Sequence, residues 1–207
     1  MDINAPLFTA AQSHVLISAR KLGRTCGYEA SHASQVTRLA LRLFQELAPL
    51  HHLDGTARYY LVVAGILHDI GWVEGGKNHH KTALDIILNS ALLPVNSRER
   101  LIIGSVVRYH YGALPDLKHD HFAALQPDGQ QLVSYLAALL RLADGLDQPH
   151  HLQVRDLKCE ISEEEIRLWY LAPARARAEE KAARAKSDLL KQVYQRHFSI
   201  HWLSPSN

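Results

Sequence analysis

The histidine–aspartate pair His68-Asp69 ends the apolar stretch 61–67 and is the pair of side chains best placed to do chemistry. Titratable side chains are seldom buried without a partner, so this pair needs something to bind. A divalent cation would satisfy both side chains, because imidazole nitrogens and carboxylate oxygens are common metal ligands. The sequence therefore predicts a metal site at this doublet.

Further candidate ligands lie on other predicted helices: His32, His79 or His80, His110 and Asp144. Side chains on one helix face reach only neighbours three or four positions away, so ligands from several helices can meet only in the core of a bundle. Mixed nitrogen and oxygen ligands favour one or two ions of iron, manganese or zinc over magnesium, which prefers oxygen and water. The expected cofactor is a divalent transition metal.

The choice between His79 and His80 stays open on the sequence. Ala83 and Ile86 lie four and seven positions after His79 and are apolar, which favours His79 on the inward face of its helix. This spacing favours His79 only slightly, so His80 stays an alternative ligand.

Two other doublets that contain histidine do not directly follow an apolar helix. His119-Asp120 repeats the doublet, but it lies in an irregular loop with no apolar helix before it, so we expect it not to bind a catalytic metal. His150-His151 precedes a predicted hairpin and is expected to face solvent.

Apolar periodicity and capping residues predict a mainly α fold. The predicted helices cover 8–22, 29–47, 55–70, 79–90, a segment that opens at Asn96 or Ser97, and 128–145. Asp54 is a predicted N-cap, Asn78 can cap the helix that follows it, and Gly71 sits where a left-handed C-cap is expected.

The last third of the chain changes character. Residues 112–127 are predicted to form an irregular loop, and alternation of apolar and polar residues predicts a β-hairpin over 152–171. A long helix rich in alanine and charged residues is expected over 173–200. The organisation expected is one domain over 1–207, with a helical metal-binding core over 8–148 on which the C-terminal helix packs.

Composition bounds the function only loosely. The 207 residues are 47% hydrophobic and 21% charged, and the net charge of +2 neither indicates nor excludes an anionic partner. The start lacks the features of a signal peptide, and no apolar stretch reaches the ~18–20 residues of a membrane span. We therefore expect a cytoplasmic protein, with Cys26 and Cys159 as free thiols. Mixed charges along the C-terminal helix argue against nucleic-acid binding. The sequence leaves open whether the protein forms a homodimer.

The order of these residues resembles the ligand set of the HD superfamily of metal-dependent phosphohydrolases. That pattern has a histidine on an early helix, a histidine–aspartate doublet ending a later one, and a distant aspartate, which here are His32, His68-Asp69 and Asp144. The local sequence 65–71, GILHDIG, also matches. Members that hold two metals add histidines between the doublet and the last aspartate, where His79, His80 and His110 lie. The resemblance implies an HD-domain helical bundle.

A closer resemblance covers residues 12–200. It is to the C-terminal HD-like domain of the exopolyphosphatase and guanosine pentaphosphate phosphatase family, and it is carried by 78–81, 89–90, 107–110 and 139–147. In that family the phosphatase active site lies in two actin-like N-terminal domains, whose glycine-rich phosphate loops this sequence lacks. The resemblance therefore implies the helical domain standing alone with a complete HD ligand set, and exopolyphosphatase activity is not carried over.

The function expected is hydrolysis of a phosphorylated small molecule, with a nucleotide as the leading candidate. Asp69 and His68 are the expected catalytic residues: Asp69 would bridge two metals, and a water or hydroxide held there would attack phosphorus. The alternatives are a non-catalytic regulatory module that binds nucleotide or polyphosphate, and a dimerisation scaffold. Lys81, Arg108 and Arg141 are the expected phosphate-binding residues.

Two residues near the last aspartate have competing interpretations. Arg141 lies one helical turn before Asp144 and could pair with it instead of binding phosphate. Asp147 lies one turn after Asp144 and could support a ligand or simply form the polar end of the helix.

Overall fold

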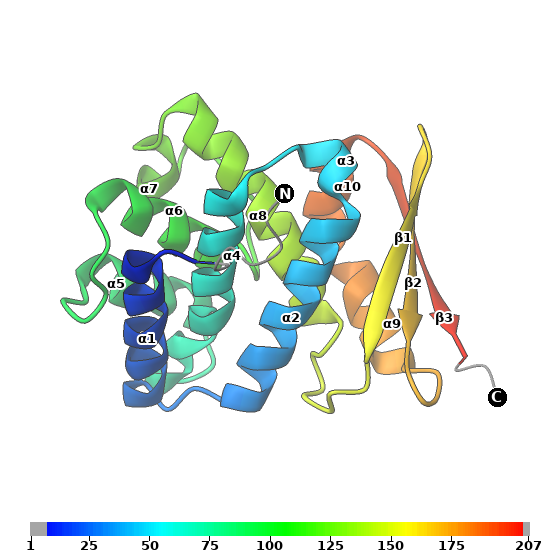
Figure 1. The fold of residues 1–207 in the computed structure, drawn as a ribbon, viewed down its shortest axis with the longest axis horizontal. Coiled ribbons are helices and arrows are strands. Elements are labelled where there is room, and N and C mark those ends of the chain that lie inside the picture. Colours follow the sequence, from blue (N-terminus) through cyan, green and yellow to red (C-terminus); the bar gives the residue numbers. More distant parts are fainter. Residues whose placement is uncertain (1–7, 205–207) are drawn as a thin grey trace.

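The computed structural model describes residues 8–204, and the N-terminal residues on which the signal-peptide expectation rests lie outside this range. A helical bundle occupies one side of the molecule and a small sheet the other (Figure 1). The helices of the bundle are α1 (Ala10–Thr25), α2 (Ala30–Glu46), α3 (Ala48–His51), α4 (Gly55–Leu67), η1 (Ile70–Glu74), α5 (His79–Asn89), α6 (Ser97–Arg108), α7 (Asp120–Ala123) and α8 (Pro127–Gly145). The protein is mainly α, as predicted.

Helix α4 is the central element of the bundle and carries the doublet at its end. Its N-cap is Asp54, as predicted, and the carboxylate accepts a hydrogen bond from the backbone N–H of Ala57 at 3.0 Å. Every residue from Tyr59 to Leu67 is buried, because α1, α2, α6 and α8 all pack against this helix. A helix that is apolar all round belongs in a core. His68 directly follows this buried helix and is itself buried.

Gly71 lets η1 approach the backbone of α5. A Cβ at this position would lie 1.9 Å from the carbonyl oxygen of His79 and 2.7 Å from the backbone nitrogen of Ala83. The expected left-handed C-cap at Gly71 is wrong, since its φ is not positive. Glycine is required here for close packing, and this packing brings the segment after Asp69 against the start of α5.

Helices α5 and α6 differ in how they begin. Asn96 caps α6 and forms a capping box with Glu99, so the helix opens at Ser97 as predicted. Asn78 precedes α5 in a left-handed conformation with φ of 68° and makes no side-chain cap hydrogen bond, so the expected capping interaction is absent there.

The sheet has three strands in the order β1-β2-β3: β1 (Asp156–Ile161), β2 (Glu165–Leu171) and β3 (His197–Leu203). The predicted hairpin forms, and β1 pairs antiparallel with β2 so that Leu157 faces Tyr170. Strand β3 runs parallel to β2 and closes the sheet (Figure 1). The inward side chains of β2 join the buried core that begins at α1.

The expectation of one long helix over 173–200 is wrong. The segment forms α9 (Arg177–Ala185) and α10 (Asp188–Tyr194), both packed against α8, and then β3. At the junction the hydroxyl of Ser187 donates to the carbonyl of Arg184 at 2.8 Å. Beyond α10, alternating residues pair with the free edge of β2, because such pairing with a distant strand outweighs local helix propensity.

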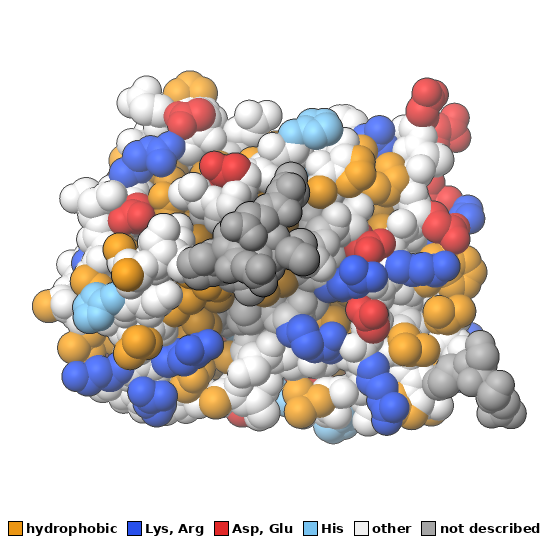
Figure 2. All heavy atoms as spheres, in the orientation of Figure 1, with side chains coloured by type: hydrophobic (Ala, Val, Ile, Leu, Met, Phe, Trp, Pro, Cys, Tyr) orange, Lys and Arg blue, Asp and Glu red, His pale blue; other side chains and the backbone are white. Residues whose placement is uncertain are grey.

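Charged side chains are spread over the surface of the molecule. Lys and Arg side chains on the face in Figure 2 are scattered, and toward the sheet they lie beside acidic ones. Within residues 8–204, no helix combines the length and apolarity needed to cross a membrane. Cys26 and Cys159 are free thiols, as expected.

Candidate metal centre

Four of the predicted ligands form two histidine pairs in the bundle core. The Nε2 atoms of His32 and His68 lie 3.3 Å apart, and those of His79 and His110 lie 3.2 Å apart. All four side chains are buried. They come from α2, the end of α4, the start of α5 and the end of α6, so the bundle is what brings them together.

Each of these rings points its Nε2 inward because its Nδ1 is bound to an oxygen. The Nδ1 partners are the Gly65 carbonyl for His68 at 2.8 Å, the Val107 carbonyl for His110 at 2.6 Å, the Gly76 carbonyl for His79 at 3.2 Å, and the Asp147 carboxylate for His32 at 2.9 Å. A carbonyl or carboxylate oxygen only accepts, so each Nδ1 carries a proton, and Nε2 is the ring atom left to bind either a second proton or a metal ion.

Two facing Nε2 lone pairs at this separation repel each other unless a positive charge lies between them. That charge is either a proton or a metal ion. Two nitrogens bound to one ion at about 2.0–2.1 Å lie about 2.8–3.4 Å apart for octahedral to tetrahedral angles. The observed 3.3 and 3.2 Å separations therefore fit a first-row metal ion without movement of the rings.

The carboxylate of Asp69 lies between the two pairs and turns one oxygen toward each. Oδ2 is 3.7 Å from Nε2 of His32 and 3.5 Å from Nε2 of His68. Oδ1 is 3.6 Å from Nε2 of His79 and 3.5 Å from Nε2 of His110. A carboxylate in this position can bridge two cations, one bound by each histidine pair.

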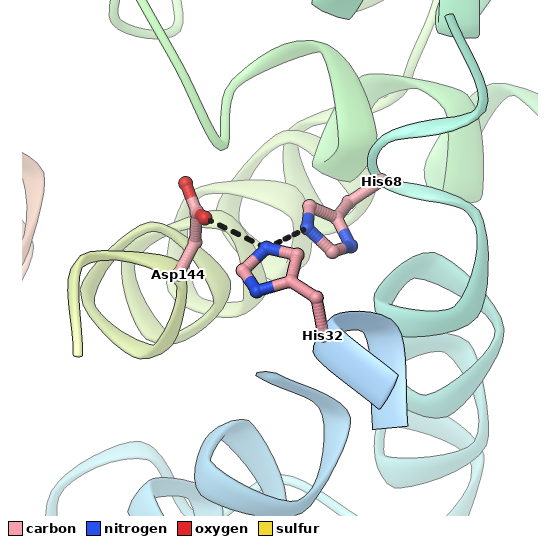
Figure 3. Close-up of side chains that lie close together, drawn as sticks. All are labelled: His32, His68 and Asp144. Atoms are coloured by element: carbon pink, nitrogen blue, oxygen red, sulfur yellow. Dashed lines mark hydrogen bonds and ion pairs between the residues drawn. The ribbon is translucent and has the colours of Figure 1, made fainter. Parts of the chain in front are cut away.

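Asp144 completes the first pair from α8. Its Oδ1 lies 3.5 Å from Nε2 of His32, and Figure 3 shows His32 between Asp144 and His68. Its other oxygen, Oδ2, accepts a hydrogen bond from the ammonium of Lys186 at the α9–α10 junction. His32, His68 and Asp144 form one group of atoms close enough to share a metal ion, and Asp69, His79 and His110 form another.

Electrostatics separates the two histidines of the first pair. Burial lowers the pKa of His32, but hydrogen bonds to Asp144 and Asp147 outweigh burial and raise the pKa to about 9. Burial lowers the pKa of His68 to about 4 and keeps that ring neutral, as a ligand must be. The site thus combines a neutral donor with a position that attracts positive charge.

Both carboxylates of the centre stay ionised. Burial raises the pKa of Asp69, but the imidazoles of His68 and His110 outweigh it and hold the pKa below its ordinary value. Burial likewise raises the pKa of Asp144, while Lys186 and His32 hold it well below the ordinary value. Ionised carboxylates beside imidazole nitrogens are the donor set that transition metals prefer.

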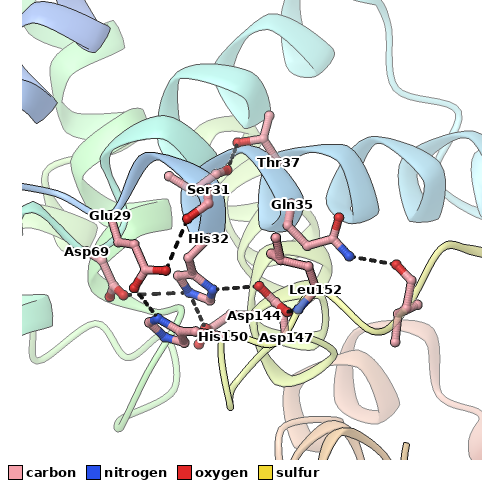
Figure 4. A network of polar contacts seen from close by, with 12 residues as sticks. Glu29, Ser31, His32, Gln35, Thr37, Asp69, Asp144, Asp147, His150 and Leu152 are labelled. Carbon is pink, nitrogen blue, oxygen red and sulfur yellow. Dashed lines mark hydrogen bonds and ion pairs between the residues drawn. The ribbon is translucent and has the colours of Figure 1, made fainter. Parts of the chain in front are cut away.

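Asp147 holds the ring of His32. One carboxylate oxygen accepts from Nδ1 of His32, and the other accepts from the backbone N–H of Leu152 at 2.8 Å (Figure 4). The ring of His150 stacks on His32 with centroids 3.6 Å apart, and its Nδ1 is 2.6 Å from the carboxylate of Glu29. His32 is therefore fixed on both its edge and its face.

Asp147→Asn is expected to weaken metal binding by about 10- to 100-fold, because a partner that orients a metal-binding histidine contributes that much to affinity. Competition with a chelator would measure the change. Asp128→Asn is the matched control, since Asp128 is an exposed carboxylate of α8 that pairs with Arg98. Unchanged affinity in the Asp147 variant would contradict a supporting role for this carboxylate.

The structure separates His79 from His80. His79 joins the group with His110 and Asp69, whereas the ring of His80 stands at 87° to that of His79 and packs against Tyr111. Burial and the nearby guanidinium of Arg108 lower the pKa of His80 to about 3. Its Nδ1 is buried and has no hydrogen-bond partner among the described residues. His80 does not lie in the centre.

The three expected phosphate-binding cations lie elsewhere. Arg141 is buried and binds Asp188, with Nε 2.7 Å from Oδ1, so its suggested pairing with Asp144 is wrong. Arg108 is buried with its guanidinium over the ring of Tyr109, 5.7 Å from the centroid. Lys81 is exposed in the first turn of α5. Within the part of the chain described, none of the three lines the cleft at the metal centre.

That cleft has a volume of about 410 Å³ and opens directly onto the two carboxylates. Its lining residues are Asp69, Trp72, Gly76, His79, Tyr111, Asp144, Gln148, His150 and Lys186. Lys186 is the one Lys or Arg side chain among them.

Sequence reasoning missed Lys186 and His150. Lys186 sits in a run of mixed charges, and His150 lies in a loop pair that was expected to be solvated, so neither carries a local signal. The second histidine–aspartate doublet, His119-Asp120, lies outside the centre. Nδ1 of His119 is 2.8 Å from the hydroxyl of Tyr109.

Comparison with known families adds an independent finding. The model of the family described as Ppx/GppA phosphatase, domain III, matches residues 16–192. The chain belongs to this family. Domain III supplies both the helices that carry the six candidate ligands and the α9–α10 junction that carries Lys186, since all of these lie within the match. No curated protein gives a significant match. Membership relates the chain to phosphatases, and its buried histidine and aspartate groups could bind a metal.

Proposed function

We propose that this domain III protein is an HD-type metal-dependent phosphohydrolase that acts on a phosphorylated small molecule, with a nucleotide as the leading candidate. The observation that carries the proposal is the position of Asp69, which turns one oxygen toward each of two facing histidine pairs. Two ions would be held as follows: one by His32, His68 and Asp144, the other by His79 and His110, with Asp69 between them.

Ions bound at these residues would acidify a coordinated water and neutralise charge on phosphoryl oxygens. The nitrogen and oxygen donor set favours iron, manganese or zinc and disfavours magnesium. Two carboxylates of the protein would orient the residues that hold these ions. Asp69 turns one carboxylate oxygen toward each histidine pair, and Asp147 binds Nδ1 of His32 and so keeps its Nε2 facing Asp69.

Lys186 is the residue placed to receive the phosphate. It lines the cleft and donates a hydrogen bond to Asp144, beside the place where an anionic substrate would need a cationic partner. An ammonium offers three rotatable donors and acts as a point charge, so it can contact phosphoryl oxygen while still near its carboxylate partner. Lys186 thus takes the role for which Lys81, Arg108 and Arg141 were the sequence candidates.

Metal analysis and a substrate screen test the proposal together. Protein produced in medium supplemented with iron, manganese or zinc is expected to bind about one to two equivalents per chain. It should release phosphate from at least one member of a panel of nucleotides, sugar phosphates and polyphosphates, and a chelator should abolish the release.

Two outcomes would overturn this function in different ways. Protein without bound metal under all three supplements would remove the basis for the chemistry. Metal-loaded protein that binds panel members without releasing phosphate would instead favour the regulatory nucleotide- or polyphosphate-binding module.

A further inference from the structure

Two aromatic side chains at the cleft are unusually open to solvent. Trp72 is 55% exposed and Tyr111 is 44% exposed, yet both line the same cleft as Asp69 and Asp144. Large aromatic rings exposed at a polar cleft mark surfaces that a ligand can cover. Neither residue is among the ligands of the metal ions proposed above.

Trp72 is held firmly in place. Its indole stacks on the ring of His79, with centroids 5.0 Å apart and planes 16° apart. The loop that follows η1 packs closely against the same indole. A Cβ on Gly76 in this loop would lie 2.2 Å from a carbon of the six-membered ring of Trp72. Gly75, with φ of 101°, makes that fold of the loop possible. A ring anchored in this way loses little freedom when a ligand stacks on it.

Tyr111 lies close to both an imidazole and an ammonium of the cleft. Its ring lies 5.2 Å from that of His79, and the ammonium of Lys186 lies over the ring, 5.3 Å from its centroid. The lining of the cleft therefore combines carboxylates, an ammonium and aromatic surface. Gln148, exposed on the lining, adds an amide that can donate and accept hydrogen bonds.

We infer that Trp72 and Tyr111 form a subsite for the planar base of a nucleoside phosphate whose phosphate lies toward Lys186. The inference rests on the proposed function for the phosphate end, and it selects nucleotides over sugar phosphates and inorganic polyphosphate. Stacking of a base on an aromatic side chain needs only a π-face, so the subsite accepts any base. A cleft of about 410 Å³ falls at the small end of ligand sites, consistent with a single nucleotide.

Binding of matched probes tests the subsite. AMP carries a base that ribose 5-phosphate lacks, and tripolyphosphate has neither base nor sugar. The affinity of the full-length protein for each probe is measured from the quenching of tryptophan fluorescence, before turnover. We expect AMP to bind at least about tenfold more tightly than ribose 5-phosphate. Trp72→Ala should weaken AMP binding by about tenfold and leave ribose 5-phosphate unchanged, with the variant followed by calorimetry.

The control variants separate stacking from disturbance of the metal centre. Val73→Ala alters an equally exposed neighbour that does not line the cleft, and it should leave all affinities unchanged. Trp72→Phe keeps a π-face and should restore most of the AMP affinity. Metal content should stay at the wild-type level in both Trp72 variants, which shows that His79 is intact.

The results distinguish failure of the subsite from failure of the hydrolase. Equal affinity for AMP and ribose 5-phosphate, unaffected by Trp72→Ala, or tightest binding of tripolyphosphate would overturn the subsite while leaving phosphate release in the screen untouched. Base-dependent AMP binding by a protein that neither holds metal nor releases phosphate would retain the subsite and remove the hydrolase.

Discussion

Asp69→Asn is expected to lose bound metal from both positions and to lower phosphate release on the order of a thousandfold or more. The carboxylate lies 3.5–3.7 Å from four imidazole nitrogens and carries the negative charge that they share. An amide keeps the shape but offers one neutral oxygen, so it cannot serve both histidine pairs. Metal content by elemental analysis and the rate of phosphate release measure the two effects.

The sequence contains a matched control for this substitution. Asp120 belongs to the second histidine–aspartate doublet, is exposed, and lies outside every group of potential ligands in the described chain. Asp120→Asn should therefore leave metal content and rate unchanged. Full metal content and activity in the Asp69 variant, or their loss in the Asp120 variant, would mean that the centre is not where we place it.

Lys186→Met is expected to have the second largest effect, and it should act on both catalysis and stability. Removing the ammonium takes the only Lys or Arg side chain away from the described lining of the cleft, so kcat/KM should fall by about 10- to 100-fold. The loss also leaves the buried carboxylate of Asp144 without its cationic partner. Breaking a buried ion pair from one side lowers the free energy of unfolding by about 3 kcal/mol in metal-free protein.

Added metal should restore most of that stability, because a cation bound to Asp144 compensates the same charge and stabilises the folded state. Denaturant unfolding with and without metal measures this, and steady-state kinetics give the change in kcat/KM. Lys181→Met is the control, since Lys181 is an exposed residue of α9 away from the cleft. Lys186→Arg should keep the stability of the metal-free protein.

An unchanged kcat/KM in Lys186→Met would remove Lys186 from phosphate binding. A loss of stability that added metal does not restore would show that Lys186 has a purely structural role beside Asp144.

Local features of the sequence predicted most of the bundle and the members of the candidate centre. Amphipathic spacing and capping residues such as Asp54 and Asn96 act within a turn or two, so they can be read from neighbouring residues. His68-Asp69 follows a fully apolar segment, whereas His119-Asp120 does not. The apolar neighbours predict that the first doublet is buried, and this distinguishes the two doublets on the sequence alone.

Only the tertiary structure decided what depends on contacts between distant segments. His79 and His80 are adjacent in sequence, and the packing of η1 on α5 at Gly71 determines which ring faces Asp69. Lys186 lies 42 positions from Asp144, and no periodicity connects the two residues.

The same reason explains the C-terminal segment. Helix propensity over 173–200 is a local quantity, whereas the free edge of β2 and the surface of α8, which divide this segment into two helices and a strand, exist only after the rest of the chain has folded. The sequence by itself therefore determined the candidate ligands and most of the helices that carry them. The fold decided which cation and which aromatic rings surround them, because those neighbours are set by long-range packing.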